Sequence, residues 1–403
     1  MAARPVPILY VHHRPELGGA PQSLANLLEA LDRDRFEPHV YCPPGPAADL
    51  FAGVAEVHTG PVAGFTHIWA STYRGRRWIL FARELARLPA HARAFGRLLE
   101  ARRFKLVHLN DSPLVAAAWL AHRAGIPVVW HLRSALANGG RDRRSRALRW
   151  TIRNLSSVSI AISDEVAETF RLGSLVVPNS VDLARFEPGD PGQAKDALGL
   201  RRDLPVVTYV GFIYPSKGFE DFIRAASILR RRGDAAQFLI VGGPVRGAEF
   251  FETAVGRALA MLDLARDYEA DAKRLVERLG LEGSVHFVPF TPDTTVLYQA
   301  SDVVVAPSRG PELSRPVLEA QACGRPVVAS GATGGGRIVL PDETGFLVPR
   351  RSPDVLAAVL RELIRNERLR LAVGDSARRH AEVNFDGARN AERVEAAYDQ
   401  VLS

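Results

Sequence analysis

Residues 204–243 read LPVVTYVGFIYPSKGFEDFIRAASILRRRGDAAQFLIVGG. An apolar, β-rich run is followed by a glycine-containing loop, then by an amphipathic helical pattern, and then by a second apolar run. Strands that are apolar throughout and alternate with helices are typical of a parallel sheet covered on both faces. This stretch therefore predicts one repeat of a doubly wound α/β domain.

The same alternation continues on both sides of this stretch. Between the two halves, residues 176–192 (VVPNSVDLARFEPGDPG) are rich in turn formers and predict a linker. We therefore expect two Rossmann-like domains, at 1–182 and 183–384, and a last helix at 385–403 that can pack back on the first domain. Further strand signals occur at residues 7–13, 104–110, 126–132, 157–163, 284–290, 301–308 and 325–330.

Composition excludes several classes of protein. The 403 residues are 47% hydrophobic and 24% charged, and no apolar run approaches the ~20 residues that span a bilayer. The only cysteines are Cys42 and Cys323, which excludes a disulfide scaffold, a cysteine-rich zinc module and an iron–sulfur protein. The chain starts without the pattern of a signal peptide, so the expected location is the cytoplasm.

Two glycine-containing loops are candidate phosphate sites. Gly18 and Gly19 precede a helix that starts near Pro21, so bare backbone amides and a positive helix end are available to an anion. In the second half Gly211 ends a strand and Lys217 opens the next helix, where an ammonium group can reach a diphosphate. The spacing is not that of a GxxxxGK[ST] loop, which disfavours a nucleoside triphosphatase. A tight turn and a solvated helix start are the structural alternatives.

A third candidate segment is PSRGPELSRPVLEAQACGRPVVAS, residues 307–330. A polar loop leads into a helix that carries Glu319 near its start. Backbone amides from Leu313 to Arg315 suit a phosphate, and the Glu319 carboxylate suits two ribose hydroxyls. An ordinary solvated loop with a carboxylate at a helix start is the alternative interpretation.

Ten segments together resemble one family, the retaining nucleotide-sugar-dependent glycosyltransferases with the GT-B architecture. This family includes glycogen-synthase-like enzymes and bacterial mannosyl- and glucosyltransferases. The resemblance covers nearly the whole chain and implies two Rossmann-like parallel-sheet domains facing each other across a cleft, with the acceptor on the first and the nucleotide sugar on the second. The segments are GGAPQSL, VVWHLR, AISDEV, VVPNSVD, YVGFIYPSKGFEDFIRAA, FLIVGG, VHFVPFTPD, SDVVVAPS, ELSRPVLEAQACGRPVVAS and TGFLVP.

The resemblance implies a role for each matching residue. Lys217 and Arg315 would stabilise the leaving diphosphate, His131 would lie near the reacting sugar, and Glu312 would contact that sugar after a one-residue shift of the family's spacing. The other implied donor contacts are Gly18, Gly19 and Gly211 with the phosphates, Glu319 with the ribose, Val288, Phe290 and Thr291 with the base, and Leu313 and Ser314 with the sugar or phosphates.

The implied reaction is hexosyl transfer from a UDP-, GDP- or ADP-sugar to a glycan, lipid-linked or small-molecule acceptor, with retention of anomeric configuration. Such an enzyme serves polysaccharide or glycoconjugate biosynthesis and uses neither a metal nor a cofactor. The Asp32-Arg33-Asp34 sequence follows the first helix, so we interpret it as a solvated turn and not as a metal site.

Some positions depart from the family pattern. Phe212 stands where an arginine commonly follows the glycine, and Pro311 stands where the first of two paired glutamates is usual. These departures favour an alternative, a non-catalytic glycosyltransferase-like binding partner. A GT-B nucleotide-sugar 2-epimerase is a further alternative, although we identify no cluster of catalytic carboxylates and histidines for it. Other departures are Ser180, Pro289 and Arg337.

Residues 74–105 form a basic amphipathic segment with 10 basic and 2 acidic side chains. Trp78, Phe81, Leu85 and Leu88 fall on one helical stripe. Such a segment suits the anionic inner face of a membrane or an acidic glycan, and the alternative is a helix packed on its own domain. No nucleic-acid-binding signature occurs, and no GxGxxG with a later acidic residue supports a dehydrogenase.

Overall fold

The computed structural model describes residues 4–65, 78–243, 247–262, 265–289, 291, 293–309, 315–330 and 338–403. It divides into two compact units. Unit 1 comprises residues 1–181 together with 384–403, and unit 2 comprises residues 182–383. No helix among the described residues is long and apolar enough to cross a membrane.

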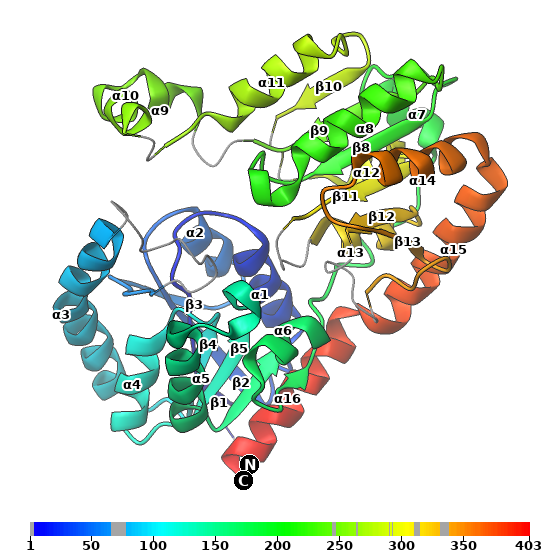
Figure 1. The fold of residues 1–403 in the computed structure, drawn as a ribbon. Coiled ribbons are helices and arrows are strands. Elements are labelled where there is room, and N and C mark those ends of the chain that lie inside the picture. Colours follow the sequence, from blue (N-terminus) through cyan, green and yellow to red (C-terminus); the bar gives the residue numbers. More distant parts are fainter. Residues whose placement is uncertain are drawn as a thin grey trace. The chain divides into compact units, whose positions relative to one another are not determined.

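Unit 1 is built on a seven-stranded parallel sheet with the order β3-β2-β1-β4-β5-β6-β7 (Figure 1). Its strands are β1 (Val6–Val11), β2 (Phe36–Cys42), β3 (Glu56–Thr59), β4 (Leu106–Asn110), β5 (Val128–Leu132), β6 (Val158–Ala161) and β7 (Leu175–Val176). Its helices are α1 (Gly19–Ala30), α2 (Pro46–Ala52), α3 (Trp78–Ala101), α4 (Val115–Arg123), η2 (Ala137–Gly140), α5 (Arg143–Leu155), α6 (Asp164–Phe170) and α16 (Gly387–Leu402).

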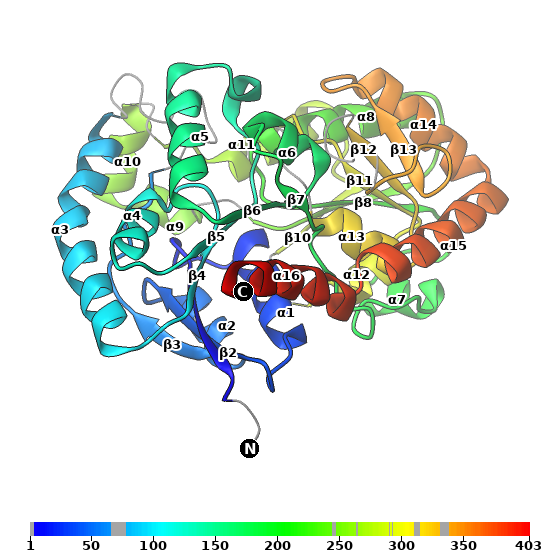
Figure 2. The same cartoon turned by 90° about the horizontal axis from the view of Figure 1, so that it is seen from below.

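Helices cover both faces of the unit 1 sheet, as its apolar strands require. One face packs against α1, α2 and α16, and the core there includes Ile8, Leu28, Phe51 and Val394. The helix α3 lies on the other face, where the Tyr41 ring contacts Phe95. The last helix of the chain thus belongs to the core of the first unit, and Figure 2 shows α16 beside α1.

Unit 2 is built on a six-stranded parallel sheet with the order β10-β9-β8-β11-β12-β13. Its strands are β8 (Val206–Val210), β9 (Gln237–Val241), β10 (Val285–Val288), β11 (Val303–Ala306), β12 (Val327–Ser330) and β13 (Gly345–Val348). Its helices are α7 (Pro191–Ala197), η3 (Pro215–Lys217), α8 (Phe219–Arg231), α9 (Ala248–Glu252), α10 (Ala254–Met261), α11 (Tyr268–Arg278), α12 (Thr295–Ala300), α13 (Arg315–Ala322), α14 (Pro353–Arg365) and α15 (Glu367–Asn384, whose last residue falls in unit 1).

Alternate residues of each unit 2 strand face opposite helical layers. Tyr209 and Phe238 pack with α8, α11 and α14, whereas Val206 and Leu239 pack with Leu297 of α12 on the other face. The strand order reverses beside β8 in unit 2 and beside β1 in unit 1. Doubly wound sheets bind ligands at the carboxyl ends of strands at such a switch point. The prediction of two parallel, doubly wound α/β domains is confirmed.

Candidate active site

Glycines follow the carboxyl ends of β8 and β9 in unit 2, beside the end of β10. The amide of Gly211 donates to the Val241 carbonyl (2.9 Å), and the amide of Gly242 donates to the Val288 carbonyl (3.0 Å). These bonds continue the strand ladder by one step, so the three strand ends lie side by side. Gly242 has φ 134°, and a Cβ there would overlap the carbonyl of Gly211. Glycine is thus required at Gly242 by close backbone approach.

Lys217 lies at the end of η3, between β8 and α8, and is partly buried. The next residue, Gly218, adopts the left-handed conformation (φ 77°), and a Cβ there would overlap the carbonyl oxygen of Pro307, which follows β11. The loop after β8 is therefore packed against the loop after β11. This packing holds Lys217 at the switch point of the unit 2 sheet.

Arg309 ties the same two loops together, and the sequence did not single it out. Its amide donates to the Ser216 carbonyl (2.7 Å), and its guanidinium donates to both oxygens of Asp221 (2.6 and 2.8 Å). A further bond reaches Glu220 (3.1 Å), also in the first turn of α8. Asp221 and Glu220 raise the pKa of Arg309. Because these two carboxylates already bind the guanidinium, the role of Arg309 is structural: it holds the loop after β11 against the start of α8.

Glu319 of α13 is buried and hydrogen-bonded on both oxygens. Oε1 accepts from the guanidinium of Arg315, one helical turn earlier (3.0 Å), and Oε2 accepts from the hydroxyl of Tyr298 (2.7 Å). Burial, followed by the charge of Glu319, raises the pKa of Tyr298 well above its usual value. The Nε of Arg315 also donates to Oε1 (3.2 Å), so three of the roughly four acceptor positions of the carboxylate are used and one remains for a ribose hydroxyl.

The remaining predicted donor contacts divide into two groups. Val288 ends β10, and the Thr291 hydroxyl donates to the Asp293 carbonyl (3.1 Å). The other predicted donor contacts lie outside the described residues; they are Phe290, Glu312, Leu313 and Ser314. Two of the departures from the family pattern, Pro311 and Arg337, lie outside them as well.

In unit 1, Gly18 precedes α1 and Gly19 is the first residue of that helix. Gly18 is the N-cap, with extended backbone (φ 165°) and no capping side chain. The first amides of α1 are therefore available to an anion. A Cβ built on Gly18 has no neighbour within 4 Å.

A buried polar network occupies the carboxyl ends of β1, β4 and β5, beside the start of α1. The side-chain amide of Asn110 lies 3.0 Å from His12 Nδ1 and 3.3 Å from the carbonyl of Ala20 in α1. Arg133 donates from Nε to Asn110 Oδ1 and from Nη1 to Asn179 Oδ1 (2.7 Å). Burial, followed by the charge of Arg133, lowers the pKa of His12 to about 3, so its imidazole is neutral.

Asp111, directly after β4, has φ 122°, which is strained for any residue other than glycine. Its Oδ1 accepts from the amides of Ser112 (2.7 Å) and Arg133 (3.3 Å), and its carbonyl accepts from the indole of Trp130 (2.9 Å). Burial raises the pKa of Asp111. Strain that several contacts hold in place is a common feature of functional sites.

His131 lies at the end of β5 and terminates a chain of hydrogen bonds that begins at α16. The Tyr398 hydroxyl donates to Tyr10 (3.1 Å) and lies 2.7 Å from His108 Nδ1, and His108 Nε2 lies 3.3 Å from His131 Nδ1. Burial lowers the pKa of His108 and of His131 well below the usual value, so both rings are neutral.

We assign the tautomer of His131 from the direction of this series of hydrogen bonds. Because the single proton of Tyr398 goes to Tyr10, His108 donates from Nδ1 to Tyr398 and accepts at Nε2 from His131 Nδ1. The proton of His131 is then on Nδ1. Its Nε2 carries a lone pair and has no hydrogen-bond partner among the described residues, although the atom is buried.

Replacing Tyr398 with phenylalanine is expected to reverse this tautomer. Without the hydroxyl, His108 moves its proton to Nε2 and donates to His131, which then carries its own proton on Nε2. Long-range ¹H–¹⁵N spectra of the imidazole rings distinguish the two forms. Tyr41→Phe is the matched control, because the Tyr41 side chain is also buried, whereas its hydroxyl donates to the carbonyl of Pro61 and takes no part in this series of hydrogen bonds. Unchanged His131 resonances in Tyr398→Phe would refute the assignment.

Comparison with known proteins identifies the family to which this chain belongs. A model described as glycosyl transferases group 1 matches residues 192–380, and one described as glycosyltransferase family 4 matches residues 17–185. A D-inositol 3-phosphate glycosyltransferase of Mycobacteroides abscessus is 30% identical over 348 residues, 79% of this chain and 73% of the relative. The chain therefore belongs to the GT-B glycosyltransferase family, as its sequence motifs predicted.

Two further comparisons define the extent of the similarity. A D-inositol 3-phosphate glycosyltransferase of Rhodococcus opacus is 35% identical over 227 residues, 55% of this chain and 47% of the relative, so the chain spans about half the length of that relative. The crystal structure of Anabaena HepE in complex with UDP-glucose has a TM-score of 0.78 at 22% identity, and covers 98% of this chain and 99% of that one. The structural match is a match of fold.

Proposed function

We propose that the chain transfers a hexosyl group from a nucleoside-diphosphate sugar to a glycan, lipid-linked or small-molecule acceptor, with retention of anomeric configuration. The observation that carries the proposal is the position of its polar groups. In each unit they follow the strands at the point where the strand order reverses, and in unit 1 they include the buried lone pair of His131 Nε2. The family supplies the reaction class.

In the proposed function the donor phosphates meet positive charge and backbone amides. Lys217 of unit 2 supplies a point charge for the diphosphate. In unit 1 the first amides of α1, after Gly18 and Gly19, form a helix N-terminus that suits a phosphate, as the family resemblance implies. These groups stabilise the charge that develops as the bond from the sugar carbon to the phosphate oxygen breaks, and the reaction as proposed uses no metal or cofactor. The guanidinium of Arg315 already donates to Glu319, so it stabilises the diphosphate only by binding both the phosphate and the Glu319 carboxylate.

The nucleoside half of the donor is assigned to unit 2. Glu319 accepts a ribose hydroxyl with the lone pair that Arg315 and Tyr298 leave available. Val288 and Thr291 contact the base. The bound UDP-glucose of the Anabaena structure supports a uridine nucleotide as the first donor to test.

His131 is assigned to the transferred sugar. Its Nε2 lone pair accepts a hydrogen bond from a sugar hydroxyl and so positions the anomeric carbon. In the proposed front-face reaction the acceptor oxygen bonds to that carbon on the side from which the phosphate leaves. The acceptor proton passes to the departing phosphate oxygen, which balances the reaction without a protein base and retains configuration.

A thermal-shift screen tests the donor proposal directly. UDP, GDP, ADP and their common sugars are each added at ~100 times the expected dissociation constant, which stabilises a binding protein by ~2.7 kcal/mol. We expect one nucleotide to raise the melting temperature and Lys217→Ala to remove that shift. If none of them raises it, the donor assignment is wrong.

One observation favours the non-catalytic alternative. Phe212, at the position where the family commonly has an arginine, is 39% exposed and presents an aromatic ring instead of a charge. A protein that binds a nucleotide sugar through the remaining groups but does not turn it over would fit this substitution. Product analysis with radiolabelled donor separates the two, because binding without transfer supports the non-catalytic protein.

Replacing Gly18 with alanine is expected to weaken donor binding about tenfold without changing stability. The extended backbone and the empty space around a Cβ at Gly18 mean that the methyl group causes no strain. It would nevertheless lie where the proposed phosphates approach the amides of α1. Nucleotide titration and a thermal melt on the same sample check both parts. Equal affinity in Gly18→Ala and wild type would place the phosphates elsewhere.

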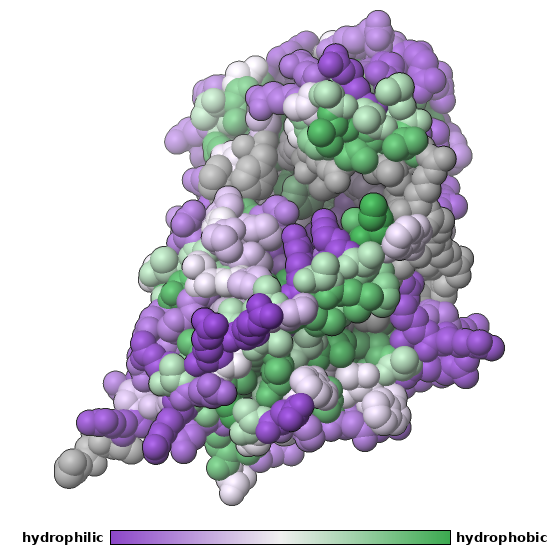
Figure 3. Space-filling model, turned by 90° about the vertical axis from the view of Figure 1, so that its left-hand side faces the viewer, coloured by the Kyte–Doolittle hydropathy of each residue, from purple (hydrophilic) through white to green (hydrophobic). Residues whose placement is uncertain are grey.

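We also propose peripheral contact between α3 and an anionic membrane. Trp78, Phe81 and Leu85 are exposed at the start of α3, whereas Phe95 and Leu99 of the same helix are buried. Figure 3 shows apolar and hydrophilic side chains next to one another on the face that carries this helix. An apolar stripe beside basic residues suits a lipid headgroup region.

Sedimentation with anionic vesicles tests the membrane proposal. We expect salt-sensitive binding that the double variant Trp78→Ser, Phe81→Ser reduces several-fold. The control is Trp150→Ser, which removes an exposed tryptophan (69% exposed) from α5. Equal sedimentation of the double variant and wild type would exclude α3 as the contact.

A further inference from the structure

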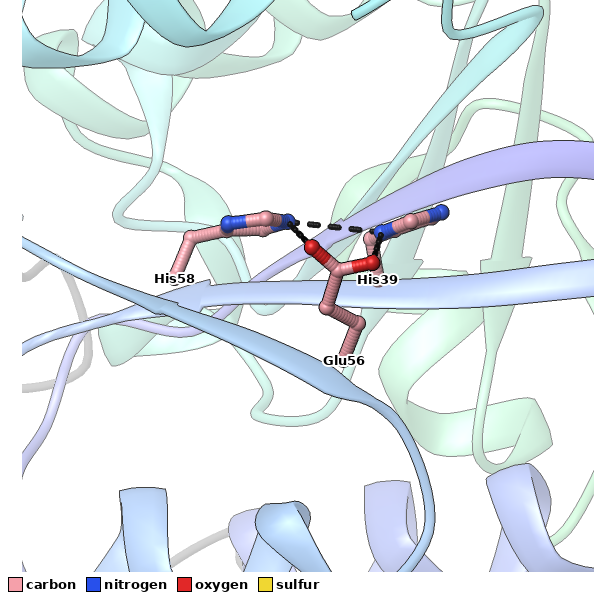
Figure 4. Close-up of side chains that lie close together, drawn as sticks. All are labelled: His39, Glu56 and His58. Carbon is pink, nitrogen blue, oxygen red and sulfur yellow. Dashed lines mark hydrogen bonds and ion pairs between the residues drawn. The ribbon is translucent and has the colours of Figure 1, made fainter.

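Three side chains of the types that bind metal ions meet at the β3 edge of the unit 1 sheet. His39 lies on β2, and Glu56 and His58 lie on the neighbouring edge strand β3 (Figure 4). His39 pairs in register with Glu56, and Glu56 and His58 are two residues apart. Because side chains alternate along a strand, all three point to the same face of the sheet.

The spacing of their ligand atoms is that of a tetrahedral metal site. His39 Nδ1 and His58 Nε2 are 3.3 Å apart, Glu56 Oε2 is 3.3 Å from the first, and Glu56 Oε1 is 3.6 Å from the second. Two ligands bound at ~2.0–2.1 Å in a tetrahedral zinc site are about 3.3–3.4 Å apart. His39 Nδ1 already has this spacing to His58 Nε2 and to Glu56 Oε2, and the ligand atoms of all three residues lie within 4.8 Å of one another, so a zinc ion can be bound without a change of strand register.

Neighbouring groups orient the three ligands. The carboxylate of Glu37 lies 3.5 Å from His39 Nε2, which favours the proton on that nitrogen and leaves the Nδ1 lone pair facing the cluster. Arg102 donates to Glu56 Oε1 (2.6 Å), so Oε2 remains available for a metal. His39 is buried, with its ring edge-on to Phe104 (5.2 Å).

Charge and ligand type also suit a cation. The carboxylates of Glu37 and Glu56 outweigh the single guanidinium of Arg102 by one negative charge. Two nitrogen ligands and one carboxylate favour zinc over magnesium or calcium, which prefer oxygen ligands.

We propose that His39 Nδ1, Glu56 Oε2 and His58 Nε2 bind one zinc ion, with water as the fourth ligand. The side chains of Glu56 and His58 are 45% and 19% exposed, so solvent reaches the remaining position. The ion joins the edge strand β3 to β2, and its role is to stabilise unit 1. It is separate from the groups proposed to act in glycosyl transfer.

Zinc binding is measured on the tag-free, chelator-stripped chain by competition with a chromophoric chelator. We expect one tightly bound equivalent in wild type, about 100-fold weaker binding in His58→Ala and Glu56→Gln, and about tenfold weaker binding in Glu37→Gln. His122→Ala, which removes an exposed histidine of α4, is the control and should bind as wild type does. Bound zinc should raise the melting temperature of unit 1 by about 5 °C.

Cobalt provides a second readout that does not depend on stability. In a four-coordinate nitrogen–oxygen site Co²⁺ absorbs visible light far more strongly than the hexaaquo ion, so wild type should develop this band and His58→Ala should not. Glu56→Gln conserves side-chain volume at a half-exposed position and is expected to fold. The proposal is overturned if wild type binds no stoichiometric zinc, or if His58→Ala and Glu56→Gln bind it as tightly. The cluster is then an ion-pair network only.

Discussion

Lys217→Ala is expected to lower kcat/KM for glycosyl transfer by about 100-fold, the loss typical of removing one group that stabilises developing charge. Lys217 sits between the first strand of the unit 2 sheet and α8, and Gly218 fixes it against Pro307. No change of backbone accompanies the substitution, so the folded structure should persist. Initial rates at varied donor concentration measure the effect.

The chain provides a matched control for this substitution. Lys273 lies on α11 of the same unit and forms an exposed ion pair with Glu269 one turn away (2.7 Å). Lys273→Ala removes the same charge and should leave transfer within about twofold of wild type, because such pairs contribute little. Comparable losses in the two variants would mean that general charge, and not the position of Lys217, supports the reaction.

Lowering the pH from 7 to 5 is expected to destabilise unit 1 by more than 2 kcal/mol. His12 has a folded pKa of about 3, whereas an unfolded histidine titrates near ~6.5. Below pH ~6.5 the unfolded chain therefore binds a proton that the folded chain excludes, and stability falls by ~1.4 kcal/mol per pH unit. His12 alone accounts for about 2 kcal/mol at pH 5.

Other buried groups modify this acid effect. Burial also lowers the pKa of His108 and His131, so both add to the loss as the pH falls. Asp111 opposes it, because burial raises the pKa of its carboxyl and acid removes an unfavourable charge. The three histidines outnumber this one carboxyl, so the net direction is loss of stability in acid.

Tryptophan fluorescence can follow unit 1 selectively. By sequence all five tryptophans fall within residues 1–181, and Trp130 is fully buried. Urea unfolding at pH 7, 6 and 5 gives the pH dependence, and His12→Gln should reduce its slope by ~1.4 kcal/mol per pH unit. The control His122→Gln, at an exposed position, should leave the slope unchanged. Equal stability at pH 7 and pH 5 would contradict the prediction.

The sequence was sufficient for the fold because each strand is a short apolar run next to a helical pattern. The strand at residues 206–210 and the helix at 219–231 are visible as periodicity alone. The candidate site could be predicted only in part. Asn110 and Arg133 lie close to His12 because β1, β4 and β5 are neighbours in the sheet, and local sequence patterns do not predict the order of strands.

For the same reason the sequence does not predict the hydrogen bonds that lead from Tyr398 to His131, or the cluster of His39, Glu56 and His58. Tyr398 reaches His108 across 290 positions of sequence, and no local pattern predicts which sheet a terminal helix covers. His39 stands on a different strand from Glu56 and His58, and the Glu-x-His spacing becomes informative only once β2 and β3 are paired in register. The sequence signal that could have identified these residues is a polar side chain within an apolar strand or directly after it.

The return of α16 to unit 1 determines the order in which the two units can be completed during synthesis. Unit 2 is continuous from residue 182 to 383 and can close its core as soon as it leaves the ribosome. The sheet of unit 1 is translated earlier, but α1 and α2 cover only part of one face until residues 384–403 emerge and α16 completes that side of the core. The unit that is made first is thus finished last, and the apolar side chains that α16 covers stay exposed in the nascent chain while unit 2 is translated.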